Sequence, residues 1–120
     1  MATITKKLSV TGAGLTSNQL ALTLSEVLTV TTPHIGLSKV SVPHDSTTDV
    51  VKAAETVAVY VYLRNMDTAN FVVLKNAASQ VWGVLHPGES IMFAVQPLKG
   101  FEIQADTASC FVEYGYWTKG

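Results

Sequence analysis

Three histidines are the residues of this chain best suited to hold a metal ion or to move protons near neutral pH. His34, His44 and His86 each adjoin a proline, and none has a partner at the short spacing of a metal-binding motif such as His-x-His. We therefore predict that they are turn residues. A metal site built from histidines that meet only in space stays open as the alternative.

Acid–base catalysis needs carboxylates or histidines that converge in a cleft. Cys110 begins the apolar run Cys110–Val112 and has no electropositive neighbour in sequence, which favours a small buried hydrophobe over a reactive thiol. The segment Thr11–Gly14 lacks the Gly-Lys-Thr continuation of a phosphate loop. The acidic residues fall at predicted turns or on outward strand faces: Asp45, Asp67, Glu89, Asp106, Glu102 and Glu113. From these observations together we predict no catalytic residue, no metal site, no cofactor and no enzymatic activity.

Composition narrows the function classes further. Charged residues make up only 14% of the 120 residues, and the net charge is −1. Without a basic stripe, nucleic-acid binding through phosphate neutralisation is not expected. No apolar run reaches the length of a membrane span, so no membrane partner is expected. The N-terminal segment has no apolar core of a secretory signal, which predicts synthesis in a cytoplasm without export by that route.

The elements that must position any functional residue are clearest in the C-terminal half. Alternating apolar and polar residues predict strands, since successive side chains point to opposite faces. Pro87-Gly88 is the pairing that a type II turn prefers. The predicted strands are Thr56–Arg64, Phe71–Lys75, Gln80–Leu85, Ser90–Val95, Phe101–Ala105 and Cys110–Trp117.

The N-terminal half gives weaker signals. Ile4–Val10 is predicted as a strand, and Gln19–Val30 fits a strand or a helix, with strand favoured by its Thr and Val content. Leu37–Val42 is predicted as a strand bracketed by Pro33 and Pro43. Val50–Glu55 is either a helical turn or a short strand. Ala2–Lys7 is predicted as the domain's own first strand.

Several short strands at even spacing predict an all-β fold. We expect an antiparallel β-sandwich of jelly-roll type with about eight short strands, forming a single domain over residues 1–120. One cysteine allows no internal disulfide.

Aromatic residues on the outward strand faces are the strongest functional signal. Tyr, Trp and Arg are enriched where proteins meet proteins. The alternative is that both faces of these strands are buried by the chain itself. The predicted interface residues are Ile4, Leu8, Tyr60, Tyr62, Arg64, Trp82, Phe111 and Trp117.

The stretch from Val59 to Trp117 carries motifs in a characteristic order: Val59–Asn65, Leu85-His86-Pro87-Gly88-Glu89, Ala105–Cys110 and Val112–Trp117. In this order it resembles small virion structural proteins of tailed bacteriophages, notably capsid cement or decoration proteins with jelly-roll domains. The resemblance implies a protein assembled in the host cytoplasm that binds the outside of the capsid. Its implied partners are the major capsid protein and further copies of itself, as a homotrimer that bridges coat subunits. The resemblance also implies attachment through an extended arm at residues 1–8, with Ile4 and Leu8 as anchors, although a first strand of the domain's own over Ala2–Lys7 is favoured.

Two other functions compete with this expectation. A tail or baseplate component would have the same fold and a different place in the virion. A carbohydrate-binding jelly-roll module would use Trp82 and Trp117 to stack against sugars, and an exposed tryptophan in a cleft with polar side chains beside it would favour that function.

Overall fold

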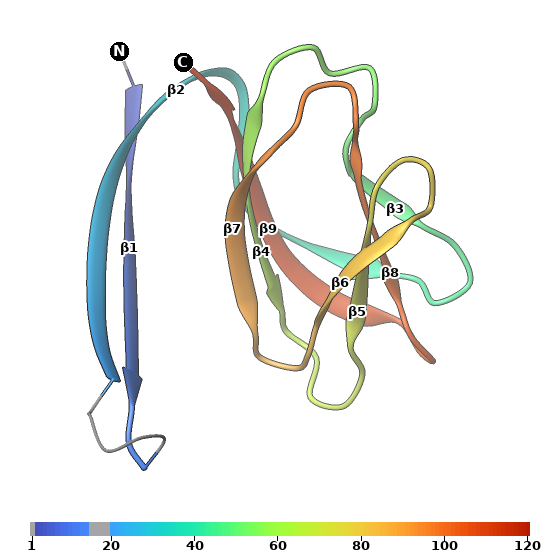
Figure 1. Ribbon diagram of the computed structural model, residues 1–120. Coiled ribbons are helices and arrows are strands. Elements are labelled where there is room, and N and C mark those ends of the chain that lie inside the picture. Colours follow the sequence, from blue (N-terminus) through green and yellow to red (C-terminus); the bar gives the residue numbers. More distant parts are fainter. Residues whose placement is uncertain (1, 15–19) are drawn as a thin grey trace. The chain divides into compact units, whose positions relative to one another are not determined.

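The computed structural model describes residues 2–14 and 20–120 and shows an all-β protein with antiparallel strands (Figure 1). This confirms the predicted fold class. Within the described residues there are nine strands rather than about eight: β1 Ala2–Gly12, β2 Leu20–Val42, β3 Thr48–Val51, β4 Val59–Asn65, β5 Val72–Lys75, β6 Val81–Leu85, β7 Ser90–Val95, β8 Phe101–Ala105 and β9 Cys110–Lys119.

The chain divides into two compact units. The first contains Met1–Thr31 together with Gly120, and the second contains Thr32–Lys119. Strand β2 contributes its first part to one unit and its second part to the other.

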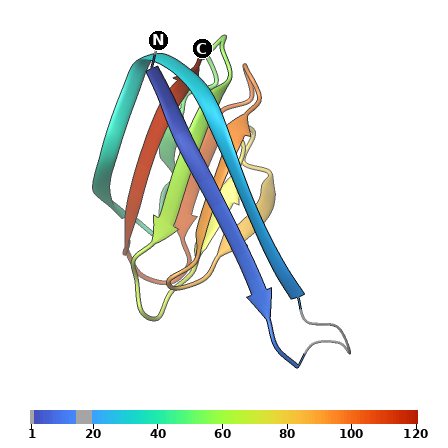
Figure 2. The same ribbon diagram turned by 90° about the vertical axis from the view of Figure 1, so that its left-hand side faces the viewer.

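The first unit is a two-stranded hairpin. β1 pairs with β2 in an unbroken antiparallel register that runs from Ala2 opposite Val30 to Gly12 opposite Leu20 (Figure 2). The favoured strand assignments are confirmed for residues 4–10 and 20–30, whereas Met1 and Gln19 lie outside the described residues. Threonine, valine and leucine at alternating positions suit a pleated strand, which explains why the helical alternative does not form.

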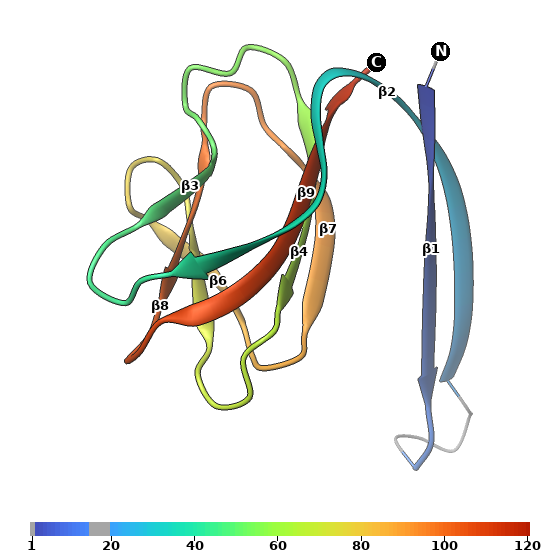
Figure 3. The same cartoon turned by 180° about the vertical axis from the view of Figure 1, so that it is seen from behind.

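The second unit consists of two facing sheets with strand orders β2-β9-β4-β7 and β3-β8-β5-β6 (Figures 1 and 3). Every connection from β2 to β9 crosses from one sheet to the other, except the one between β5 and β6. Such crossings bury one face of each sheet against the other, as in a β-sandwich. This order favours the jelly-roll subclass, which stays a prediction.

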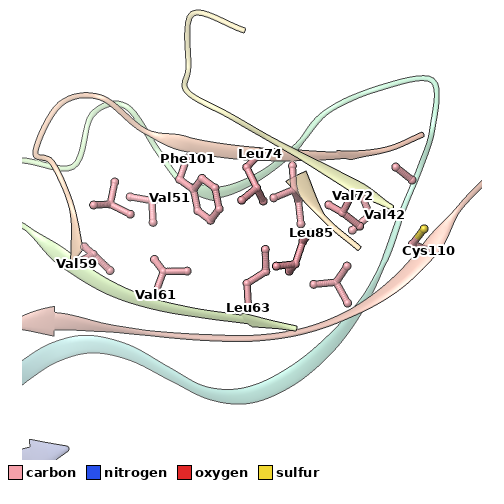
Figure 4. Packing of buried hydrophobic residues seen from close by; sticks show 14 residues of the cluster. Val42, Val51, Val59, Val61, Leu63, Val72, Leu74, Leu85, Phe101 and Cys110 are labelled. Carbon is pink, nitrogen blue, oxygen red and sulfur yellow. The ribbon is translucent and has the colours of Figure 1, made fainter. Parts of the chain in front are cut away.

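The hydrophobic core lies between these two sheets. Alternate residues of β4 point inward, as predicted, and meet Leu74 and Phe101 from the opposite sheet (Figure 4). The lone Cys110 is 1% exposed within this cluster, so its predicted burial is confirmed. The buried members are Val42, Val51, Val59, Val61, Leu63, Val72, Leu74, Leu85, Val95, Phe101, Ile103, Ala105, Cys110 and Val112.

Several predicted strand ends are shifted by one or two residues, and two predicted boundaries are wrong by more than that. β4 begins at Val59 rather than Thr56, because its ladder with β7 starts where Val59 faces Val95, and Val57 is exposed outside it. Pro33 does not end a strand but lies within β2, next to a cis Thr32–Pro33 peptide bond. The ambiguous segment 50–55 divides between the end of β3 and a turn, in which the Glu55 amide donates to the Lys52 carbonyl.

The turns contain the residues that their geometry requires. Gly88 has a φ of 80°, and the Glu89 amide donates to the His86 carbonyl, as the Pro-Gly pair predicts. Asn65 is fully buried at the end of β4, and its side-chain amide donates to the carbonyls of Asn70 and Leu85. Its side-chain oxygen accepts the Asp67 amide. This one side chain therefore joins two loops of the second unit.

Candidate functional site

One face of the hairpin is almost wholly aliphatic. Because the register is regular, the residues of β1 and β2 that share this face also lie opposite one another. Leu22 is 41% exposed and Leu24 is 46% exposed. A two-stranded ribbon cannot bury either of its own faces, so these side chains depend on another surface for burial. We call this surface the hairpin apolar face: Ile4, Leu8, Val10, Leu20, Leu22, Leu24, Leu28 and Val30. Its exposed part runs over Leu8, Val10 and Leu20–Leu24, since Val30 is buried and Ile4 and Leu28 are half-buried.

The predicted anchors Ile4 and Leu8 both belong to the hairpin apolar face; Ile4 is half-buried and Leu8 is exposed. A single charged row, Lys6 opposite Glu26, interrupts the aliphatic side chains. The opposite face of the ribbon is mostly Thr and Ser, so the apolar character belongs to one side only. Such one-sidedness is typical of a sheet that packs against a surface on one face and meets water on the other.

Aromatic side chains gather on the outward face of β4 and β9 in the second unit. The register places Tyr60 opposite Trp117 and Tyr62 opposite Gly115. A Cβ on Gly115 would lie 3.0 Å from the Trp117 ring, so the indole lies over this glycine. Glycine is therefore needed there for the close approach of the ring. We call this surface the outer aromatic face: Tyr60, Tyr62, Arg64, Glu113 and Trp117.

A hydrogen bond joins two side chains of the outer aromatic face. The Tyr62 hydroxyl donates to Oε1 of Glu113 at 2.9 Å, and Arg64 lies opposite Glu113 in the register. Partial burial, followed by the bond to Glu113, raises the pKa of Tyr62. Phe111 points outward near the start of β9 and is 62% exposed. The structure thus places these predicted residues on the outward side, and their role in an interface stays a prediction.

Trp82 belongs to neither of these faces and lines a pocket of the second unit. Its indole is 50% exposed and stacks edge-on against Phe93 at 5.3 Å between ring centroids. Phe101, which belongs to the core, lies 5.8 Å from the indole and 5.2 Å from Phe93. The pocket has a volume of about 400 Å³ and is lined by Asn76, Trp82, Phe93, Ala94, Val95, Gln96, Lys99, Gly100 and Phe101.

A β-bulge directs Trp82 into this pocket. In the β5–β6 ladder Leu74 faces Gly83 and Lys75 faces Val81, so Trp82 is an extra residue without a partner. Strict alternation would place Trp82 on the outer side with Val84, whereas the extra residue turns the side chain towards Phe101. The sequence pattern alone did not reveal this pocket, because the bulge depends on how β6 pairs with β5.

A second pocket of about 430 Å³ opens where β3 and β9 lie near the second part of β2, and Asp49, Lys52, Tyr114 and Tyr116 are among its lining residues. Asp49 also faces Glu102 in the β3–β8 ladder. Desolvation, together with the Asp49 carboxylate, raises the pKa of Glu102. Sequence reasoning placed Glu102 on an outward strand face but missed this carboxyl pair, which depends on strand order.

The residues first considered for chemistry do not converge. All three histidines are exposed, and in the described part of the chain no three His, Cys, Asp or Glu side chains could hold one metal ion together. Burial, followed by the charges of Asp67 and Asp106, raises the pKa of the Cys110 thiol, which opposes thiolate formation.

Comparison of the chain with protein-family models, curated proteins and solved structures gives no match. Among residues 2–14 and 20–120, no helix is long and apolar enough to cross a membrane.

Proposed function

We propose that this protein is a structural component of a phage virion, a cement or decoration protein that binds the outside of the capsid and bridges coat subunits. It acts by burying its outward faces against the major capsid protein and against further copies of itself in a homotrimer. The observation that carries this proposal is the hairpin apolar face, which presents a row of leucines on a ribbon that cannot bury them.

The charge composition supports the same function. With 14% charged residues and a net charge of −1, the chain has little electrostatic repulsion to oppose close packing of copies. The outer aromatic face adds Tyr60, Tyr62, Trp117 and Arg64, residue types that dominate binding energy at protein interfaces. Neither surface needs a catalytic group in order to bind a partner, which suits a protein that acts only by binding other proteins.

The size of the hairpin apolar face indicates that it does not act alone. An 11-residue strand is roughly 37 Å long, and a two-stranded ribbon is roughly 10 Å wide. This gives about 370 Å², less than the roughly 800 Å² that each partner buries in a standard interface. Stable attachment therefore requires a second surface, for which the outer aromatic face has the suitable residues.

The test measures mass in solution by light scattering and co-sedimentation with assembled capsids of the virus that encodes the chain. We expect a defined oligomer that binds capsids at a saturable ratio. Replacing two leucines of the hairpin apolar face, Leu22→Thr with Leu24→Thr, should weaken capsid binding by about 2 kcal/mol, or roughly thirtyfold in Kd.

The matched control is Thr23→Asn on the opposite face of the same strand, which should bind as tightly as the parent protein. A monomer that ignores capsids would overturn the cement proposal. Binding to isolated tails in place of capsids would move the protein to a tail or baseplate position.

A further inference from the structure

The pocket beside Trp82 has features that an interface between flat surfaces does not require. Its volume of about 400 Å³ falls in the range of roughly 300–1,000 Å³ typical of small-molecule sites. Its walls are the rings of Trp82, Phe93 and Phe101, and its rim carries the polar side chains of Gln96 and Lys99. An aromatic wall with polar groups at the rim can bind a ligand that is apolar on one side and hydroxylated around its edge.

The backbone around this pocket is fixed before any ligand arrives. The Ala77 amide donates to the Lys99 carbonyl at 3.1 Å, and the Leu98 amide donates to the Glu55 carbonyl at 2.9 Å. Gly100 has a φ of 70°, and a Cβ there would lie 2.9 Å from the Cβ of Ala77, so the loop packs tightly against the neighbouring turn. A preformed rim reduces the entropy lost on binding.

The rim has hydrogen-bonding groups that the described part of the chain does not use. No hydrogen bond joins the Trp82 indole N–H, the Gln96 amide or the Lys99 ammonium to another described side chain or backbone group. Asn76 differs, because its amide already bonds Ala78 and Gln80 within its own turn. The unused groups are mainly donors, which suits a ligand rich in hydroxyl oxygens.

We propose that this pocket binds a saccharide, with the apolar C–H face of one pyranose ring stacked on the Trp82 indole. Hydroxyl oxygens of the stacked ring accept hydrogen bonds from Lys99, and Gln96 donates or accepts as that ring requires. The indole N–H points outward in the plane of the indole, so its acceptor is a hydroxyl of the neighbouring sugar residue in an oligosaccharide. The site is independent of the proposed capsid function, since it shares no residue with the hairpin apolar face or the outer aromatic face.

A sugar fits this pocket better than an apolar side chain from a protein partner. An aliphatic or aromatic side chain would fill the same walls, but it would cover the Trp82 N–H and the Gln96 amide without bonding them. Covering polar groups without partners reduces affinity. No carboxylate is among the described lining residues, which disfavours a cationic ligand.

The experiment follows the two indole N–H signals by NMR in the full chain during titration with soluble oligosaccharides of glucose, galactose, N-acetylglucosamine and glucuronic acid. We expect at least one of them to shift the Trp82 signal in a saturable way while the Trp117 signal stays fixed. Affinity should lie in the millimolar range, because one ring stacks and few hydrogen bonds form.

Variants distinguish sugar binding in this pocket from nonspecific sugar binding elsewhere on the protein. Trp82→Ala should weaken binding at least tenfold, Trp82→Phe should retain part of it, and Gln96→Ala or Lys99→Ala should weaken it several-fold. Trp117→Ala is the control and should bind unchanged. Because the titration of the parent chain needs no variant, a folding defect in Trp82→Ala does not spoil the test.

Three results would overturn the proposal. They are no shift of the Trp82 signal with any of the four sugar types, equal shifts of both indoles, and saturable binding at Trp82 of a short leucine- or phenylalanine-containing peptide without binding of any sugar.

Discussion

Asn65 shows at the residue scale how one polar side chain can organise an apolar core. It is the last residue of β4 and is buried beside two loops, and three hydrogen bonds satisfy its side-chain amide group. Its backbone also accepts the Gly88 amide and donates to the Glu89 carbonyl, so the Pro-Gly turn is fixed by the same residue. A buried polar group in this position stabilises a fold only while its partners are complete.

Removing this side chain should be costly. Asn65→Ala leaves the carbonyls of Asn70 and Leu85 and the amide of Asp67 without their partner. We expect the free energy of unfolding to fall by about 2–4 kcal/mol, since buried groups that lose their hydrogen bonds carry a desolvation penalty. Chemical denaturation monitored by circular dichroism measures the change.

Asn76→Ala is the matched comparison. Asn76 also makes three side-chain hydrogen bonds in a turn, but these bonds are exposed to water. Its loss should cost about 1 kcal/mol or less, because water replaces the missing partner. Equal costs at the two positions would show that burial is not the reason for the importance of Asn65.

At the scale of the strand, the sequence predicted most of what the structure contains. Ser90–Val95 and Phe101–Ala105 have the predicted bounds, because regular alternation between turn residues leaves little freedom. The position of Trp82 was not predictable in the same way, since the bulge that turns it inward depends on the pairing of β6 with β5. Likewise, the Glu102 pair required knowledge that β3 and β5 both lie beside β8.

A row of charges across three strands leads to a pH prediction. Glu102 on β8 lies opposite Asp49 on β3 and Lys75 on β5, and desolvation followed by Asp49 raises its pKa. A raised carboxyl pKa in the folded state stabilises the protein below the ordinary glutamate value, and this contribution is lost as the pH rises through the folded value. Glu102→Gln cannot ionise, so it should be at least as stable as the parent near about pH 7, with the difference shrinking towards about pH 4.

Asp67→Asn should change stability near neutral pH in the opposite direction from Glu102→Gln. Backbone hydrogen bonds from Asn70 and Ala69 lower the pKa of Asp67, so the ionised carboxylate stabilises the folded state above its ordinary range. This variant should be less stable than the parent near neutral pH, and the gap should close as the pH falls. Thermal unfolding across the pH range measures the stability of both variants. If the stability of Glu102→Gln, relative to the parent, changed with pH in the same direction as that of Asp67→Asn, this result would contradict the raised pKa of Glu102.

At the scale of the whole molecule, the chain divides into a unit that contains the hydrophobic core and a hairpin unit that contributes no residue to it. The hydrophobic core cluster is built only from residues 42–112, within the second unit. The hairpin offers its aliphatic side chains on a ribbon of two strands, an arrangement that is only marginally stable alone in water. The sequence signalled both parts as strands, but it did not reveal that one group of strands forms the core and the other is a separate ribbon.

We therefore expect a chain that begins at Thr32 to fold. It retains every residue of the core cluster, so circular dichroism should show strand structure and cooperative thermal unfolding. The Tm should lie within a few degrees of that of the full chain, because each 1 kcal/mol of lost stability lowers Tm by only about 4–8 °C in a domain of this size. The same chain should lose capsid binding and self-association, because it lacks the hairpin apolar face.

The full chain carrying Leu22→Lys is the control, since it retains the ribbon and changes only its apolar face. Loss of cooperative unfolding in the shortened chain would show that the two units fold as one, whereas full capsid binding without the hairpin would assign adhesion to the second unit alone.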